Sequence, residues 1–363
     1  MITVLMATWQ GKKYLEQQLD SILAQTVPVR ILISDDGSDD GTREMLDQYR
    51  EWYPKQIRLV HHKQVLEDAG TDAESSNAEA SNTEALSAGT PDTDAEGTKS
   101  SVRSGIKSGT KSRISPAAEN FFWLMSQAVL DEKNEYILLS DQDDVWFNDK
   151  VKTMIRKMKE VEKQLGKDCP VLLHSDMEVV DENLNLIDES FFAYQHCNPA
   201  RNTLAEVLVE NPATGGAMMM NRALLELVKD QPKYCCMHDW WIALTAVSFG
   251  VTGCCPDSLY QYRQHGDNTL GAKMTGSMED MKERLENQEQ VEENYQNMMR
   301  QAAVFLHHFG PQLAEEQRSV LRAFLALPLQ TPAGRMKNIL RNHFFKSSKL
   351  QTMAMCVTIP RKE

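Results

Sequence analysis

The first 65 residues alternate short apolar runs with amphipathic segments, and this alternation limits the folds that the chain can adopt. Residues 2–7, 29–34 and 57–61 have the length and apolar character of buried strands. Between them, residues 14–23 and 45–53 carry apolar side chains at helical spacing. Strands joined through helices by short links form right-handed crossovers between parallel neighbours. We therefore predict an α/β fold with a mostly parallel sheet and helices on both faces.

The same alternation resumes after an interruption. The predicted elements are a helix at 116–130, a strand at 136–140, a helix at 151–165, a strand at 171–174 and two short strands near Val251 and Leu259. Past Lys273 the chain is polar and helical, with amphipathic stretches near residues 301–308 and 315–326.

The interruption is an insertion at residues 67–115. Its first part is rich in Ala, Ser, Thr and acidic residues, and its second part, 99–113, is rich in Ser, Gly, Lys and Arg without an acidic residue. Such a composition buries too little apolar surface to offset its ordering entropy, so we expect a disordered surface insertion, a tether or an acidic–basic clasp. The expected domains are an α/β domain over 1–271, interrupted by this insertion, and a helical region over 272–363.

Composition excludes several classes of protein. A net charge of −13 argues against a nucleic-acid partner. The seven cysteines lack zinc-site spacing, and adjacent pairs such as Cys235-Cys236 rarely bridge, which predicts reduced thiols in a cytoplasmic protein. The N-terminus has no basic signal-peptide region, and no stretch approaches the roughly 20 apolar residues of a membrane span.

Acidic loops follow two of the predicted strands. The strand at 136–140 runs directly into Asp141, Asp143 and Asp144, and the strand at 29–34 runs into ISDDGSDDGT. The carboxyl ends of parallel strands share one edge of a sheet, where ligands of such sheets bind. Neighbouring carboxylates repel one another unless a cation or donors neutralise them. The loop after residue 140 is therefore either a divalent-metal site or an Asp-rich turn and helix cap.

Several motifs together resemble those of the family 2 glycosyltransferases. They are ATWQGKKYLEQQLDSILAQT, ISDDGSDDGT, LSDQDDVW, NPATGGAMMMNR, MHDWW and YRQHGDN, and they cover residues 1–271 apart from the insertion. The resemblance rests on their order and spacing, and it implies the GT-A fold, a nucleotide-binding α/β domain around a single mixed sheet. SDQDDVW, HSDMEVVDENL, HDWW and YRQHGDN look most like the rhamnosyltransferases of bacterial surface polysaccharides.

The resemblance implies roles on the side of a nucleotide-sugar donor. Thr8 and Asp36 are expected near the base and ribose, and Arg263 and His265 near the diphosphate. LSDQDDVW matches the family's DxD-type motif. Within that motif, Asp141 and Asp143 are expected to bind the nucleotide-sugar. Asp143 and Asp144 are expected to bind Mg²⁺ or Mn²⁺. Such a cation offsets the negative charge of a pyrophosphate leaving group.

On the acceptor side, Asp239 in MHDWW matches the family's catalytic base. An inverting transfer needs one carboxylate opposite the leaving group to take the acceptor's hydroxyl proton. The alternative is an Asp that caps a helix before Trp240. Many relatives have Glu before this Asp; here the residue is His238, as in the rhamnosyltransferase-like subset.

The remaining acceptor-side residues each have a structural alternative. Trp240 and Trp241 either stack on sugar faces or pack in the core. Gly215 and Gly216 either permit close backbone approach to a ligand or form a plain turn. Asp176, at the end of another predicted strand, either orients substrate or stabilises a turn.

The predicted function is therefore an inverting, metal-dependent glycosyltransferase. The expected donor is dTDP-L-rhamnose or, in the alternative, a UDP-sugar used by a hexosyl or N-acetylhexosaminyl transferase. The expected acceptor is a saccharide or a lipid-linked saccharide of the bacterial cell surface. A non-catalytic carbohydrate-binding scaffold on the same fold would predict loss of Asp239 or of the acidic motif, and both are present.

The segment MKNILRNHFFKSSKL, residues 336–350, has two interpretations. It is either an ordinary packing helix or a peripheral contact with the cytoplasmic face of an anionic membrane. Its basic and apolar side chains are Lys337, Arg341, Lys346, Lys349, Ile339, Leu340, Phe344 and Phe345.

Overall fold

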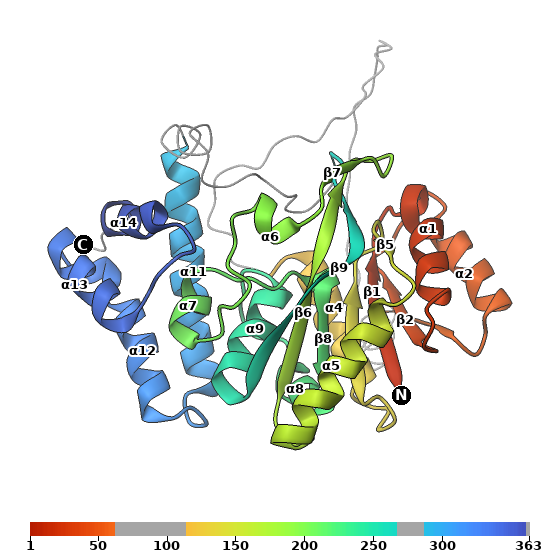
Figure 1. Ribbon diagram of the computed structural model, residues 1–363, viewed down its shortest axis with the longest axis horizontal. Coiled ribbons are helices and arrows are strands. Elements are labelled where there is room, and N and C mark those ends of the chain that lie inside the picture. Colours follow the sequence, from red (N-terminus) through yellow and green to blue (C-terminus); the bar gives the residue numbers. More distant parts are fainter. Residues whose placement is uncertain (62–113, 267–286, 361–363) are drawn as a thin grey trace, which may run out of the picture. The chain divides into compact units, whose positions relative to one another are not determined.

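The computed structural model describes residues 1–61, 114–266 and 287–360 (Figure 1). These residues belong to one compact unit. The insertion predicted at 67–115 lies outside the described residues, except for Ile114 and Ser115. The division into domains at residue 271 also falls outside the described residues and stays a prediction.

A mixed sheet forms the centre of this unit. In the described part of the chain it has nine strands, in the order β3-β2-β1-β4-β8-β6-β9-β5, with β7 beside β6. The strands are β1 (Ile2–Thr8), β2 (Arg30–Asp35), β3 (Ile57–Val60), β4 (Tyr136–Ser140), β5 (Val145–Trp146), β6 (Val171–Val180), β7 (Leu186–Asp188), β8 (Met218–Asn221) and β9 (Val251–Arg263). The block β3-β2-β1-β4 is parallel, and β8 pairs antiparallel with both β4 and β6. The predicted α/β class is confirmed.

Helices cover both faces of the sheet. They are α1 (Lys12–Leu23), α2 (Thr42–Trp52), α4 (Pro116–Ala128), α5 (Lys150–Leu165), α6 (Phe191–Tyr194), α7 (Leu204–Val209), α8 (Arg222–Val228), α9 (His238–Phe249), α11 (Gln288–Phe309), α12 (Glu315–Leu325), α13 (Pro332–Asn342) and α14 (Lys349–Thr358). Short 3₁₀ turns lie at Gly215–Ala217 and Leu327–Leu329. One core holds α1 and α5 against the sheet through side chains such as Leu15 and Met154. The other holds α4, α9 and the C-terminal helices through side chains such as Phe121 and Phe305.

Two predicted strands are longer than the sequence pattern indicates. β6 continues to Val180, and the two short strands expected near Val251 and Leu259 form one strand, β9. The two long strands pair in parallel, with Ser175 opposite Cys255 and Asp176 opposite Ser258. The register shift leaves Pro256 and Asp257 as a β-bulge. The strand therefore continues through these two residues, where the sequence pattern predicted a break between two strands.

The C-terminal helices pack on the α/β core. α11 and α12 lie beside α7 (Figure 1). Within segment 336–350, Ile339 and Phe344 are fully buried, and α13 ends at Asn342 because His343 has a positive φ of 59°. The segment is therefore not one continuous amphipathic helix. In the described part of the chain, no helix is both long enough and apolar enough to cross a membrane.

Candidate active site

Two carboxylates of the acidic loop converge on a glycine. A Cβ on Gly216 would stand 3.2 Å from Oδ2 of Asp144 and 3.5 Å from Oδ2 of Asp141. A larger side chain at residue 216 would therefore require the Asp144 carboxylate to shift by a few tenths of an ångström. This places the acidic loop and the Gly-rich segment, 71 to 75 positions apart in sequence, at one site through the pairing of β4 with β8.

Burial and mutual repulsion disfavour the charged forms of Asp141 and Asp144. Burial, with the charges of Asp143 and Asp239, raises the pKa of Asp141 to about 7. Burial, with the charges of Asp143 and Asp141, raises the pKa of Asp144 well above its ordinary value. Oδ2 of Asp144 is buried and has no hydrogen-bond partner in the described structure. Such an oxygen is normally satisfied by a donor or a cation.

A buried lysine that the sequence analysis did not identify lies beside this pair. Nζ of Lys150 donates a 2.6 Å hydrogen bond to the Gly216 carbonyl and sits 3.9 Å and 3.8 Å from the ring centroids of Trp146 and Tyr260. Burial lowers the pKa of Lys150 well below its ordinary value, and the carboxylates of the acidic loop oppose this shift. Sequence pattern could not identify it, because Lys150 begins a helix whose other lysines are exposed or half-buried.

Arg263 forms hydrogen bonds with the acidic loop. Its backbone N–H donates to Oδ1 of Asp144 at 3.2 Å, and its Nε donates to the Asp143 carbonyl at 2.7 Å. The terminal nitrogens donate to the Glu182 carbonyl and to Oε1 of Gln17, each at 2.6 Å, and the side chain is 2% exposed. The expected contact with a diphosphate stays a prediction, and it would require some of these bonds to be exchanged.

His265, the second basic residue expected near the diphosphate, contacts the same loop. Its Nε2 lies 2.8 Å from Oδ2 of Asp143, and its ring packs 4.8 Å from the ring of Tyr14. The side chains of His265 and Asp143 are 9% and 15% exposed.

The expected base-and-ribose residues meet at the ends of β1 and β2. Oγ1 of Thr8 donates to Oδ1 of Asp35 at 2.9 Å, and the backbone N–H of Asp36 donates to the Thr8 carbonyl at 2.9 Å. Asp35 also accepts from the backbone N–H groups of Gly37 and Ser38 at 3.0 and 2.8 Å. Asp35 therefore shapes the turn, and Asp36 is half-buried beside it.

Asp239 lies in the first turn of α9, where the N-cap position belongs to Met237. Burial raises the pKa of Asp239 to about 6, although the backbone N–H groups of Trp240 and Gly215 bond to it and oppose the shift. Its charge contributes to the raised pKa of Asp141, which places the two carboxylates within electrostatic reach. A carboxylate of this kind can accept a proton near neutral pH.

His238 and Gly215 fit each other closely. The imidazole stacks on Phe121 with ring centroids 4.0 Å apart, and a Cβ on Gly215 would stand 2.9 Å from its Nε2. Burial lowers the pKa of His238 to about 3, so the ring is neutral. Both ring nitrogens of His238 are buried without a hydrogen-bond partner in the described structure, and its acceptor-side role stays a prediction.

The other acceptor-side residues have mainly structural contacts. Trp241 is fully buried against Phe305, so its ring belongs to the core and does not face an accessible sugar. Nε1 of Trp240 donates to the Val207 carbonyl at 2.6 Å, and the side chain is half-buried. Asp176 is 4% exposed and accepts from Oγ of Ser190 at 2.5 Å. It lies within β6 and not at a strand end, because that strand continues to Val180, so its expected placement is wrong and its role toward substrate stays a prediction.

The carboxylates of the acidic loop are the candidate ligands of a metal ion. Within residues 1–61, 114–266 and 287–360, no group of three or more His, Cys, Asp or Glu side chains is arranged as a metal site. The donor set nevertheless fits an oxygen-preferring divalent cation, since Asp144 presents an unsatisfied buried oxygen next to two further carboxylates.

Comparisons with known proteins address the family and the fold. The family model described as glycosyl transferase family 2 matches residues 3–69. The dTDP-rhamnosyl transferase RfbG of Shigella flexneri is 23% identical over 288 residues, which are 74% of this chain and 75% of that protein. The crystal structure of S. aureus TarS superposes with a TM-score of 0.50 and 14% identity, covering 90% of this chain. This chain spans only 43% of the TarS chain.

The fold is that of the GT-A glycosyltransferases, and the resemblance to family 2 is confirmed. Within that class, the chain is similar to the dTDP-rhamnosyl transferase of Shigella flexneri, as the motifs indicated.

Proposed function

We propose that this protein is an inverting glycosyltransferase that moves L-rhamnose from dTDP-L-rhamnose to a saccharide or a lipid-linked saccharide in cell-surface polysaccharide synthesis. The observation that carries the proposal is the placement of a half-buried carboxylate, Asp239, and a separate acidic loop on either side of the Gly-rich segment. The choice of donor rests on the similarity to a dTDP-rhamnosyl transferase.

In the proposed reaction, Asp239 is the general base. The acceptor hydroxyl oxygen attacks the anomeric carbon, the bond from that carbon to the diphosphate oxygen breaks, and the hydroxyl proton passes to the Asp239 carboxylate. Attack opposite the leaving diphosphate inverts the anomeric centre. The hydrogen bonds from the Trp240 and Gly215 backbone N–H groups orient the carboxylate.

The donor side of the site is assigned to the acidic loop. Asp143 and Asp144 would hold Mg²⁺ or Mn²⁺, with Asp141 next to the nucleotide-sugar. When bound, the cation offsets the charge that develops on the diphosphate. Thr8 and Asp36 would contact the base and ribose, and His265 lies where it can reach the diphosphate beside Asp143. Gly216 keeps the approach to the carboxylates open.

The cellular setting follows from the substrates. A nucleotide-sugar donor is a cytoplasmic metabolite, and the proposed enzyme therefore works in the cytoplasm or on the cytoplasmic face of the plasma membrane. The free thiols of all seven cysteines support a reducing compartment.

The experiment is a donor panel on the purified full-length protein with Mn²⁺. Thermal shift and release of nucleoside diphosphate are measured with dTDP-rhamnose, UDP-glucose and UDP-N-acetylglucosamine. Stabilisation and turnover with dTDP-rhamnose support the proposal. A response to a UDP-sugar alone would favour the hexosyl or N-acetylhexosaminyl alternative. Carbohydrate binding without any response to a nucleotide-sugar would favour a non-catalytic scaffold.

A further inference from the structure

The C-terminal part of the chain has a charge opposite to that of the whole. No acidic residue occurs between Glu316 and Glu363, although the protein carries a net charge of −13. The basic residues in that interval are Arg318, Arg322, Arg335, Lys337, Arg341, Lys346, Lys349, Arg361 and Lys362. Arg335 is buried, and Arg318 and Arg322 pair with Glu315. Lys337, Arg341 and Lys349 are exposed.

Exposed apolar side chains lie on α13 and α14, the helices on which Lys337, Arg341 and Lys349 lie. Leu350, Met353 and Val357 of α14 are 51%, 60% and 70% exposed, and their spacing of three and four residues places them on one face. The opposite face of α14, with Met355 and Cys356, is buried. On α13, Leu340 is 55% exposed and shares a face with the exposed bases Lys337 and Arg341.

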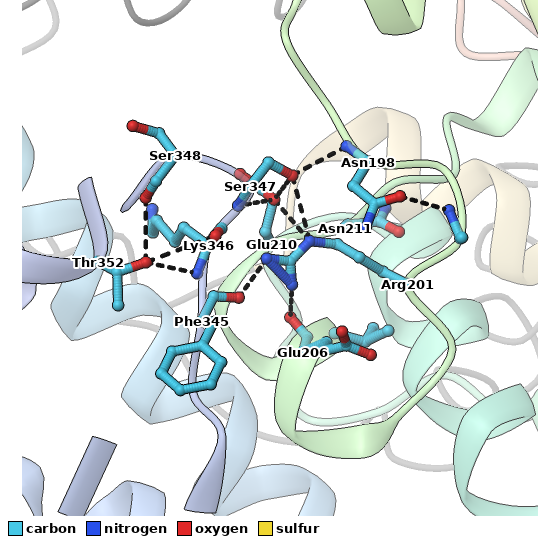
Figure 2. A network of polar contacts seen from close by, with 12 residues as sticks. Asn198, Arg201, Glu206, Glu210, Asn211, Phe345, Lys346, Ser347, Ser348 and Thr352 are labelled. Carbon is cyan, nitrogen blue, oxygen red and sulfur yellow. Dashed lines mark hydrogen bonds and ion pairs between the residues drawn. The ribbon is translucent and has the colours of Figure 1, made fainter. Parts of the chain in front are cut away.

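An ion pair between a buried arginine and a partly exposed glutamate connects these helices to the segment that precedes the Gly-rich segment. Arg201, 3% exposed, pairs with Glu210 at 2.7 Å, and the backbone N–H of Ser347 donates to the same carboxylate at 2.8 Å. Figure 2 shows these three side chains pointing toward one another, with the Asn198 N–H donating to Oγ of Ser347 at 2.9 Å. Ser347 belongs to the connection between α13 and α14, and Glu210 directly precedes the segment that leads to Gly215.

We propose that α13 and α14 dock on an anionic lipid bilayer. The apolar face of α14 enters the interfacial region, and Lys337, Arg341 and Lys349 meet lipid phosphates. This corrects the expectation that Ile339 and Phe344 make the contact, because both are buried. A membrane matches both the basic charge and the apolar stripe, whereas an acidic protein partner would explain the charge alone.

Membrane docking would also affect which acceptor the enzyme uses, if the protein is the glycosyltransferase proposed above. The Arg201–Glu210–Ser347 contacts hold the connection between α13 and α14 against Glu210, which precedes the Gly-rich segment, so docking would hold the acceptor side of the site near the bilayer. A lipid-linked saccharide would then be favoured over a soluble one.

The test is co-sedimentation of the full chain with vesicles of phosphatidylcholine alone or mixed with phosphatidylglycerol. We expect binding to the anionic vesicles, and a loss of about tenfold or more in affinity for the triple variant Leu350→Gln, Met353→Gln, Val357→Gln. The triple variant Lys337→Gln, Arg341→Gln, Lys349→Gln should lose the preference for anionic lipid by a similar factor. The control is Trp52→Gln with Leu165→Gln, at sites 60% and 50% exposed on other helices, and it should bind normally.

Wild-type binding that does not depend on the anionic lipid, or an apolar triple variant that binds as the wild type does, would overturn the proposal. A change from dimer to monomer in the apolar variant, without any vesicle binding by the wild type, would assign the face to a second copy of the chain instead. Because vesicle binding needs no substrate, its outcome is independent of the donor panel.

Discussion

The buried ammonium of Lys150 donates a 2.6 Å hydrogen bond to the carbonyl of Gly216. This one contact joins the helix that follows the acidic loop to the Gly-rich segment, so it links the donor and acceptor sides of the proposed site. The same ammonium is the cation whose charge opposes the raised pKa values of Asp141 and Asp144.

Replacing that ammonium with an apolar group should therefore damage both stability and activity. Lys150→Met keeps the length of the side chain but leaves the Gly216 carbonyl without its donor. We expect a loss of about 1–3 kcal/mol in the free energy of unfolding, measured by urea denaturation, and a large loss of turnover. Lys152→Met, at an exposed position of the same helix, is the control and should change neither. Equal stability of the two variants would contradict this assignment.

Asp239→Asn separates catalysis from structure. The amide is nearly isosteric and can still accept the backbone bonds of the first turn, so the fold should persist. If Asp239 takes the acceptor proton, turnover should fall about 10²–10⁴-fold while affinity for the nucleoside diphosphate stays the same. Nucleoside diphosphate release and calorimetric titration measure the two quantities. Near-normal turnover in the folded variant would remove Asp239 as the base.

The pH dependence of activity follows from the same carboxylate. Burial raises the pKa of Asp239 to about 6, and a general base works only when deprotonated. Activity should therefore be retained above this pKa and decline as the pH falls through it, by about tenfold per pH unit well below it. The measurement is kcat/KM for the acceptor at saturating donor. The pH profile of the residual activity of Asp239→Asn should lack the inflection near this pKa. An unchanged inflection in that variant would show that another group causes the loss of activity at low pH.

Asp144→Asn tests the cation site. The amide oxygen can still accept from the Arg263 backbone, but the buried charge is lost. We expect Mn²⁺-linked binding of nucleoside diphosphate to weaken by at least about tenfold, since an anionic ligand is removed. The metal-free protein should be as stable as the wild type or slightly more so, because repulsion with Asp141 and Asp143 is relieved. The control is Asp149→Asn, at an exposed position. If Asp144→Asn and this control bind nucleoside diphosphate equally well with Mn²⁺, the assignment of Asp144 to the cation site is refuted.

Local pattern was sufficient to predict much of the fold. The parallel block β3-β2-β1-β4 could be predicted because short apolar runs alternate with amphipathic helices, and both features depend on near neighbours in sequence. The placement of Thr8, Asp36 and Asp141 at strand ends follows from the same pattern. The rule that parallel strands end at one edge then brings them together.

The pairing of distant segments decided the rest. The antiparallel β8, between β4 and β6, brings Gly216 onto the carboxylates, and no local periodicity encodes that neighbour. Packing likewise buried Lys150 beneath the site and Trp241 in the core, and it engaged Arg263 with the acidic loop. The sequence determined which residues could ionise, donate or stack. Only the tertiary structure determined which of them are desolvated and what they face, because burial and partners depend on contacts between residues far apart in the chain.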